Sequence, residues 1–227
     1  MAELVSVEDA INKIGNGMTI MVGGFLGCGS PNQLLEEVCR KGTKELTLIA
    51  NDTGILGDAL SQLIVQRCVR NIVVTHMGTN KETGKQMTAG ELDVKLVPQG
   101  TLVEQIRAAG AGLGGILTPT GIGTIVEDGK QKIVVDGTEY LLELPVRANL
   151  ALLNAHKADK DGNLVYRRSA RNFNPLMAMA ADIVIVQVDP WKDGAWYGWR
   201  DGPRRGSATC YCCHGAYDQK WWLKNPE

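Results

Sequence analysis

Short apolar runs alternate with helix-like segments along this chain, and that alternation limits the possible folds more than any other feature. Residues 18–22 form a continuous apolar run that ends at Gly23-Gly24, and a helical pattern follows over 31–40. Short apolar runs bounded by turns are typical of strands buried on both faces of a parallel sheet. The same reading predicts strands over 45–50, 71–75, 94–97, 149–155 and 182–188, and helices over 57–68, 102–109 and 175–181. This order predicts an α/β fold, an open and mostly parallel sheet with helices on both faces.

Two local motifs add to this outline. Ser6 and Asp9 have the spacing of a capping box, which predicts a helix over 6–14. The segments 132–135 and 138–144 flank Asp136-Gly137, a dipeptide that favours a type I′ turn, so a β-hairpin region is expected beside the sheet.

Charge and hydropathy exclude several classes of protein. The chain has 24 Lys and Arg against 25 Asp and Glu, and a general nucleic-acid binder would show a basic excess. No apolar run approaches the roughly 20 residues that a membrane span needs. The first ten residues are acidic, whereas a signal peptide begins with basic residues. We therefore expect a cytoplasmic protein that binds neither nucleic acid nor membrane.

The last part of the chain differs from the rest. All five tryptophans lie in 191–227, without helical or strand periodicity, so we divide the chain into one domain over 1–190 and an atypical tail over 191–227. We expect this tail to pack weakly and the sheet to lack a C-terminal strand. Reading the codons of 210–214 one base forward gives Ala or Val, Thr or Ile, Ala or Val, Ala or Val, then Thr or Met. That strand-forming run favours a frameshift, and a naturally divergent tail is the alternative.

The six cysteines indicate neither a disulfide framework nor a metal site. Cys28, Cys39 and Cys68 are widely spaced, as expected of reduced thiols in a cytosolic chain. The cluster over 210–214, with three Cys and one His, lacks the spacing of a zinc knuckle, so no metal site is predicted.

A glycine-rich turn over 23–31 is the strongest candidate for a binding site. It has four glycines in seven residues and lies between a predicted strand and a predicted helix. Such a turn lets backbone N–H groups approach a phosphate or carboxylate, although a tight turn without a ligand is the alternative. It is not a Walker A loop, and Asn32 stands where a dinucleotide-binding fingerprint requires glycine.

The residues around this turn resemble those of the family I coenzyme A transferases, and more closely the α subunits of acetate- or butyrate-acetoacetate coenzyme A transferases. The resemblance covers about residues 4–189. It rests on Asn16-Gly17, Gly23-Gly24-Phe25, Gly29, Pro31, Asn51-Asp52-Thr53, His76-Met77-Gly78-Thr79-Asn80, Pro98-Gln99-Gly100-Thr101-Leu102, Gly114-Gly115, Leu117-Thr118-Pro119-Thr120-Gly121 and Ala170-Arg171-Asn172-Phe173-Asn174-Pro175.

The resemblance implies transfer of coenzyme A from an acyl-CoA to a free carboxylic acid. In this family a glutamate attacks the thioester to give an acyl-glutamyl anhydride, and the CoA thiolate then forms a glutamyl-CoA thioester. The family carries that glutamate on the β subunit, so no catalytic nucleophile is expected in this chain. Coenzyme A is a substrate, no permanently bound cofactor is expected, and the expected partners are a β subunit, acyl-CoA and short-chain carboxylates.

The resemblance also implies which residues form the site. The loop expected to bind CoA comprises Gly23, Gly24, Phe25, Leu26, Gly27, Cys28 and Gly29. The substrate is expected to contact the Gln99 amide and the backbone N–H groups of Gly114 and Gly115, and the alternatives are a turn residue and close packing. His76 is expected to be structural, and Glu127 a solvated loop residue.

Other functions remain open at this point. A 3-oxoadipate or succinyl-CoA:3-oxoacid transferase would have the same fold and chemistry, because pocket lining from both subunits sets acyl specificity. A non-catalytic sensor of acyl-CoA is an alternative of another class.

Overall fold

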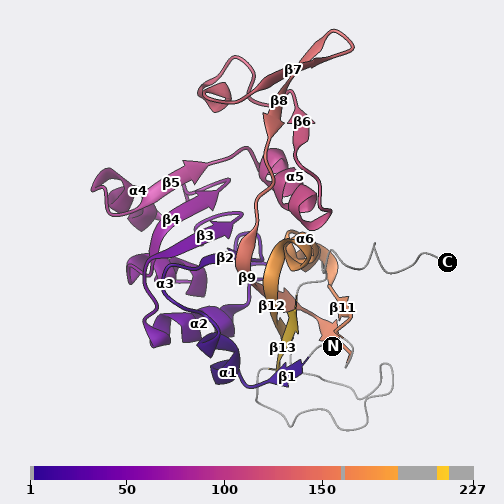
Figure 1. Ribbon diagram of the computed structural model, residues 1–227. Helices are drawn as coiled ribbons and strands as arrows, with labels where there is room; N and C mark the ends of the chain where they lie inside the picture. Colours follow the sequence, from indigo (N-terminus) through magenta and orange to yellow (C-terminus); the bar gives the residue numbers. More distant parts are fainter. Residues whose placement is uncertain (1–2, 160–161, 189–208, 215–227) are drawn as a thin grey trace, which may run out of the picture.

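An eight-stranded sheet forms the centre of the molecule (Figure 1). The computed structural model describes residues 3–159, 162–188 and 209–214. In spatial order the strands are β1 (Glu3–Val5), β13 (Thr209–His214), β12 (Ala181–Val188), β9 (Ala148–Ala155), β2 (Thr19–Val22), β3 (Leu46–Ala50), β4 (Val69–Val74) and β5 (Asp93–Leu96). The six strands from β12 to β5 are parallel, which confirms the predicted mostly parallel sheet.

Helices cover both faces of this sheet, as predicted. One face packs against α1 (Val7–Asn12), α2 (Asn32–Lys41) and α3 (Ala59–Val65), and the other against α5 (Gln99–Gly110) and α6 (Asn174–Ala180). Each face has its own buried apolar cluster, with Leu34 and Leu63 in the first and Leu102 and Met177 in the second. The capping box is confirmed, because Ser6 Oγ accepts the Asp9 N–H at 3.0 Å.

One helix, α4 (Lys81–Thr88), was not expected from the sequence. It has no apolar stripe, and its buried residues, Thr83 and Gln86, are polar. Gln86 Nε2 donates to the carbonyl of Ile64 at 2.8 Å, which attaches α4 to the end of α3.

The expected hairpin is part of a small three-stranded sheet that projects from the body as an arm (Figure 1). Its strands are β6 (Ile116–Thr118), β8 (Thr138–Glu143) and β7 (Lys132–Val135), in that spatial order. Asp136 and Gly137 both have positive φ, 49° and 76°, which confirms the type I′ turn. A short helix, η1 (Ile125–Glu127), precedes the hairpin, and the short strands β10 (Lys157–Ala158) and β11 (Leu164–Val165) pair near the end of β9.

The expectation that the sheet lacks a C-terminal strand is wrong. Residues 209–214 form β13, which lies antiparallel between β12 and β1 and covers the edge of β12. Thr, Cys and Tyr suit extended backbone, and an uncovered strand edge offers a complete row of hydrogen-bonding groups. The weak packing expected for 191–208 and 215–227 concerns residues outside the described part of the chain.

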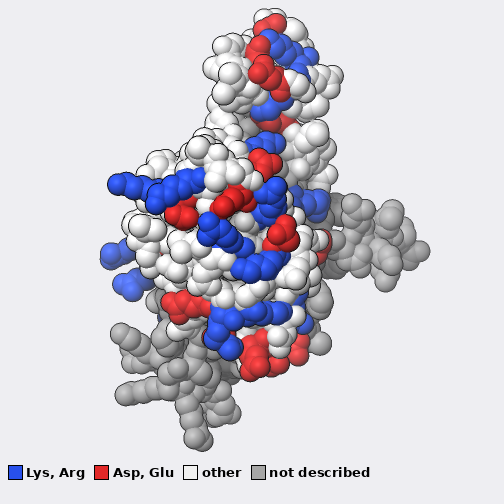
Figure 2. All heavy atoms as spheres, turned by 90° about the vertical axis from the view of Figure 1, so that its left-hand side faces the viewer, with Lys and Arg blue, Asp and Glu red and all other residues white. Residues whose placement is uncertain are grey.

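The surface agrees with the nearly equal numbers of acidic and basic residues in the sequence. Acidic and basic side chains are interspersed on the face shown in Figure 2.

Cys28, Cys39 and Cys68 are free thiols, as predicted, and a hydrogen bond to Cys68 together with burial raises the pKa of Cys39. Across the described ranges, no helix has both the length and the hydropathy to cross a membrane.

Candidate functional site

The glycine turn lies where the connectivity of the sheet changes direction. From β2 the chain adds β3, β4 and β5 on one side, and the later strand β9 pairs on the other side of β2. In open α/β sheets, ligands bind at the carboxyl ends of strands beside such a switch point. The turn leaves the carboxyl end of β2, and the Gly23 N–H donates to the Leu152 carbonyl of β9 at 3.0 Å.

The tip of the turn is a tight hairpin. Phe25 and Cys28 exchange two backbone hydrogen bonds of 3.1 and 2.9 Å, and Leu26 and Gly27 between them have φ of 46° and 81°. Positive φ at both central positions defines a type I′ turn, and it is unusual for leucine. Phe25 and Leu26 are 42% and 41% exposed, so the tip presents apolar side chains to solvent.

Two asparagines at the start of α6, Asn172 just before the helix and Asn174 as its first residue, hold the end of this turn. Asn172 Nδ2 donates to the Cys28 carbonyl at 2.9 Å, and Asn174 Nδ2 donates to the Gly29 carbonyl at 3.1 Å. Asn174 is fully buried, and its Oδ1 accepts the Asn154 N–H at the end of β9. Both asparagines therefore connect the glycine turn to the start of α6.

Contacts within the protein account for three of the four glycines. A Cβ at Gly23 would lie 2.0 Å from Asn174 Oδ1, and one at Gly24 would lie 2.2 Å from Ser30 Oγ. At Gly29 the Cβ would lie 2.8 Å from the Ala170 carbonyl oxygen. Gly27 is different, because its Cβ would meet nothing within 4 Å and its N–H has no acceptor within the described residues.

A chain of polar side chains connects this turn to Gln99. Gln99 Nε2 donates to Asn51 Oδ1 at 2.7 Å, and Asn51 Nδ2 donates to Asp52 Oδ2 at 2.8 Å. The same Asp52 oxygen accepts the Leu26 N–H at 2.8 Å. Asn51 and Asp52 are buried, whereas Gln99 is exposed, so the network opens to solvent at Gln99.

The other predicted residues lie outside this network. Gln99 is the first residue of α5, whereas Gly114 and Gly115 follow its other end, about 16 Å away along a helix of 12 residues. Gly115 packs closely on β8, since its Cβ would lie 2.9 Å from the Glu143 carbonyl oxygen. His76 is exposed, and its backbone N–H donates to the Asn51 carbonyl at 3.2 Å.

Glu127 is a paired residue at the end of the short helix η1, in the arm. It accepts the Gly123 N–H at 2.7 Å and forms a 3.1 Å ion pair with Lys132. The Gly123 N–H and the Lys132 ammonium lower the pKa of its carboxyl. The carboxylate predicted to be solvated in a loop is thus held by two local partners.

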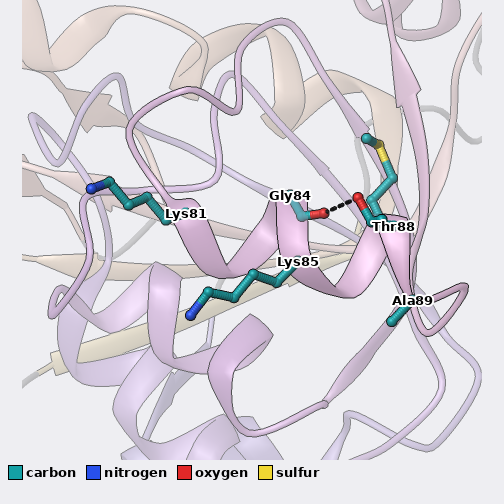
Figure 3. A pocket seen from close by; sticks show the side chains of 6 residues that line it. Lys81, Gly84, Lys85, Thr88 and Ala89 are labelled. Atoms are coloured by element: carbon teal, nitrogen blue, oxygen red, sulfur yellow. Dashed lines mark hydrogen bonds between the residues drawn. The ribbon is translucent and has the colours of Figure 1, made fainter.

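An open hollow of about 730 Å³ lies along α4, away from the residues discussed so far (Figure 3). Its lining comes from one helix and the residue that ends it: Lys81, Gly84, Lys85, Met87, Thr88 and Ala89. The Lys81 and Lys85 side chains extend in the same direction, and Lys85 lies 3.8 Å from Glu82. No residue of the Asp52 network lines this hollow, so it is a surface feature of α4.

Sequence reasoning missed Asp52 and Asn174 as parts of the site. A signal for Asp52 was present, because Asn51 and Asp52 directly follow the strand predicted over 45–50, and polar residues at the carboxyl end of a buried strand mark a site. Asn174 belongs to the motif Ala170–Pro175, but nothing in that motif indicates that its side chain reaches a glycine 145 positions earlier. No group of three or more metal-ligating residues lies together in the ranges described above.

Comparison with known proteins identifies the family of this chain. The sequence model of the family described as coenzyme A transferase matches residues 4–194. The chain belongs to the coenzyme A transferase family. Its relatives in that family include the acetate CoA-transferase subunit alpha of Escherichia coli K12, which is 56% identical over 82% of this chain and 85% of the relative. The acetoacetyl-CoA:acetate/butyrate CoA transferase alpha subunit of Clostridium acetobutylicum is 46% identical over 83% of this chain and 86% of that subunit.

Solved structures of coenzyme A transferases share the fold. Glutaconate coenzyme A-transferase from Acidaminococcus fermentans superposes with a TM-score of 0.71 at 21% identity, covering 81% of this chain and 66% of the other. The acyl-CoA transferase YdiF from Escherichia coli O157:H7 gives 0.72 at 23% identity, over 82% of this chain and 42% of that one. The predicted fold class and family are both confirmed.

Proposed function

We propose that this chain is the α subunit of a short-chain acyl-CoA:acetate or acetoacetate CoA-transferase, which moves coenzyme A from an acyl-CoA to a free carboxylic acid. The observation that carries the proposal is the 56% identity to an acetate CoA-transferase α subunit over 82% of the chain. Relatives named for succinyl-CoA:3-ketoacid and 3-oxoadipate substrates are 40–45% identical, so the acetate branch is favoured.

The glycine turn from Gly23 to Gly29 is our candidate for contact with the CoA ester. Phe25 and Leu26 offer exposed apolar surface, and Gly27 leaves open space beside a backbone N–H. A backbone N–H without a Cβ beside it can approach a carbonyl or phosphate oxygen closely. The other glycines of the turn support it through packing.

Gln99 is our candidate for contact with the substrate carboxylate or carbonyl. One N–H of its amide donates to Asn51, which fixes the orientation of the side chain, and the second N–H remains for a ligand. An exposed amide at the first turn of α5 also benefits from the partial positive charge of the helix N-terminus. Gly114 and Gly115 are weaker candidates, because they lie beyond the opposite end of that helix.

The nucleophilic glutamate is proposed to lie on a β subunit. Glu127 is engaged by Lys132 and Gly123, and Asp52 is buried and accepts three hydrogen bonds. Neither carboxylate is free to attack a thioester. The subunit names of the relatives fit a division of the site between two chains.

The test is to purify this chain with its β partner, to assay a panel of acyl-CoA donors and to trap the intermediate with borohydride. Reduction of a glutamyl-CoA thioester would mark a glutamate of the partner, and this chain alone would be inactive. A modified glutamate in this chain would overturn the division of labour. Tight acyl-CoA binding without exchange of CoA by the assembled pair would favour the non-catalytic sensor.

A further inference from the structure

We propose that Asp52 is a positioning residue of the transferase site, whose buried carboxylate holds the tip of the glycine turn in the conformation that receives the CoA ester. The proposal rests on the proposed function of the turn. The structural observation behind it is that one carboxylate joins the turn, the start of the segment after β3 and the Asn51–Gln99 pair.

Asp52 is an unusual group to find buried at this edge of the sheet. Only 2% of its surface is exposed, and within the described residues no Lys or Arg forms an ion pair with it. A buried carboxylate is costly unless hydrogen bonds stabilise its charge. Three donors do so: Leu26 N–H and Asn51 Nδ2 at one oxygen and Gly54 N–H at the other, all at 2.8 Å.

The Leu26 contact has a clear conformational role. Leu26 has φ of 46°, a left-handed region that is unfavourable for any L-residue other than glycine. A hydrogen bond to an ionised acceptor is stronger than one between neutral groups and can offset this cost. Without Asp52, Leu26 would be free to return to negative φ, and the exposed tip would open.

The other backbone donor depends less on Asp52. The Gly54 carbonyl accepts Thr79 Oγ1 at 2.8 Å, and the next N–H, of Ile55, donates to Asp58 Oδ2 at 2.8 Å. The segment after β3 therefore keeps supports of its own. Loss of the Asp52 carboxylate should act mainly on the glycine turn.

The first experiment uses Asp52→Asn in the assembled αβ enzyme, with Asp58→Asn as the matched control. Asparagine has one acceptor oxygen and no charge. Either its NH2 group faces the Leu26 and Asn51 donors, or its oxygen accepts the Leu26 N–H in a weaker, neutral hydrogen bond. Asp58 also accepts two backbone N–H groups, of Ile55 and Ser61, but makes no contact with the turn. We expect Asp52→Asn to speed hydrogen exchange of the Leu26 amide at least tenfold and to lower kcat/KM for the acyl-CoA at least tenfold, and Asp58→Asn to do neither.

A rescue variant separates positioning from general stabilisation of the fold. Leu26→Asn creates Asn-Gly, the dipeptide that adopts a type I′ turn most readily. In that background the turn should no longer need Asp52, so Asp52→Asn should change kcat/KM less than threefold relative to Leu26→Asn alone. This comparison also applies if Asp52→Asn fails to fold by itself, because a double variant that also fails to fold would overturn the proposal.

Each remaining outcome has a distinct meaning. Unchanged exchange at Leu26 in Asp52→Asn would overturn the positioning role and leave the proposed function intact. Faster exchange with normal kinetics would also overturn it, and would in addition count against any contact between the turn and the CoA ester. Faster exchange, lower kcat/KM and rescue by Leu26→Asn together would support it.

Discussion

Glycine occupies four positions of the turn for two separate reasons. Gly23, Gly24 and Gly29 allow the protein to pack against its own backbone, and any side chain there would meet Asn174, Ser30 or Ala170. Bulky substitutions at Gly24 or Gly29 would therefore disturb the fold and could not show whether a ligand approaches. Of these four glycines, only Gly27 combines positive φ with open space.

We therefore expect Gly27→Ala to weaken use of the acyl-CoA at a small cost in stability. Positive φ makes alanine unfavourable there by about 1 kcal/mol, equivalent to a decrease in Tm of roughly 2–4 °C. Gly17→Ala is the matched control, because Gly17 has φ of 76°, equally open space and a place before β2, at the opposite edge of the sheet. Both variants should melt at similar temperatures, and kcat/KM for the acyl-CoA should fall at least fivefold in Gly27→Ala only. Equal kinetics in the two variants would show that the tip is merely a turn.

The helix α5 begins at Gln99, which has both a structural role in the helix and a proposed role in substrate binding. Gln99 is its first residue, directly after Pro98, whereas the sequence placed Gln99 in a turn and began the helix at residue 102. Proline restricts the backbone where the chain enters a helix. The ends of a helix are harder to predict from sequence than its centre. The amide of Gln99 is thus held by a rigid element.

Gln99→Glu should separate these roles by changing activity with little change in stability. A carboxylate in the first turn interacts favourably with the helix dipole, which offsets the loss of the hydrogen bond to Asn51, so the free energy of unfolding should change by less than about 1 kcal/mol. The same charge cannot donate to Asn51 and repels a substrate carboxylate, so KM for acetate should rise at least tenfold, or about 1.4 kcal/mol. Thermal melts and initial rates against acetate measure the two effects. A stable variant with unchanged KM for acetate would remove Gln99 from the site.

How far the sequence predicted each element depended on how locally that element is determined. The parallel strands and α2 follow from apolar runs and turns, and the hairpin from Asp136-Gly137, all within a few residues. The helix α4 was missed because it is held by Gln86 reaching α3 and buries no apolar stripe. The strand β13 was missed because its place depends on the open edge of β12, which no local pattern in the tail reveals. In the site, the glycine turn was found from its sequence, and its supports at Asp52 and Asn174 were not.

At the scale of the whole molecule, the sheet is completed by a strand from an atypical tail. The strand β13 joins β12 to β1, so residues 209–214 connect the last parallel strand to the beginning of the chain. Removing it would leave two strand edges uncovered, which favours aggregation. The frameshift hypothesis for 191–227 therefore concerns the segment that covers these two strand edges.

We expect the tail restored to the forward-shifted frame to give a more soluble chain that assembles more readily with its β partner. The restored run of Ala, Val, Thr and Ile residues suits a strand against β12 better than the present sequence does, and the five tryptophans disappear. Sequencing of the gene around codon 190 tests the hypothesis directly. Size-exclusion chromatography of both versions, each co-expressed with the partner, tests its consequence. If the present tail gives the more soluble and better assembled protein, it is a genuine adaptation.

The glycine turn near the start of the chain is held by side chains that come much later in the sequence. Asn172 and Asn174 contact Cys28 and Gly29 across 144 and 145 positions, and β9, which flanks β2, also comes late. Contacts between such distant positions form slowly during folding, and a ribosome must synthesise most of the domain before they can form. A nascent chain therefore has its glycine sequence long before it has a shaped turn. Affinity for the ligand should consequently appear in the last folding phase, so that only a finished subunit engages substrate.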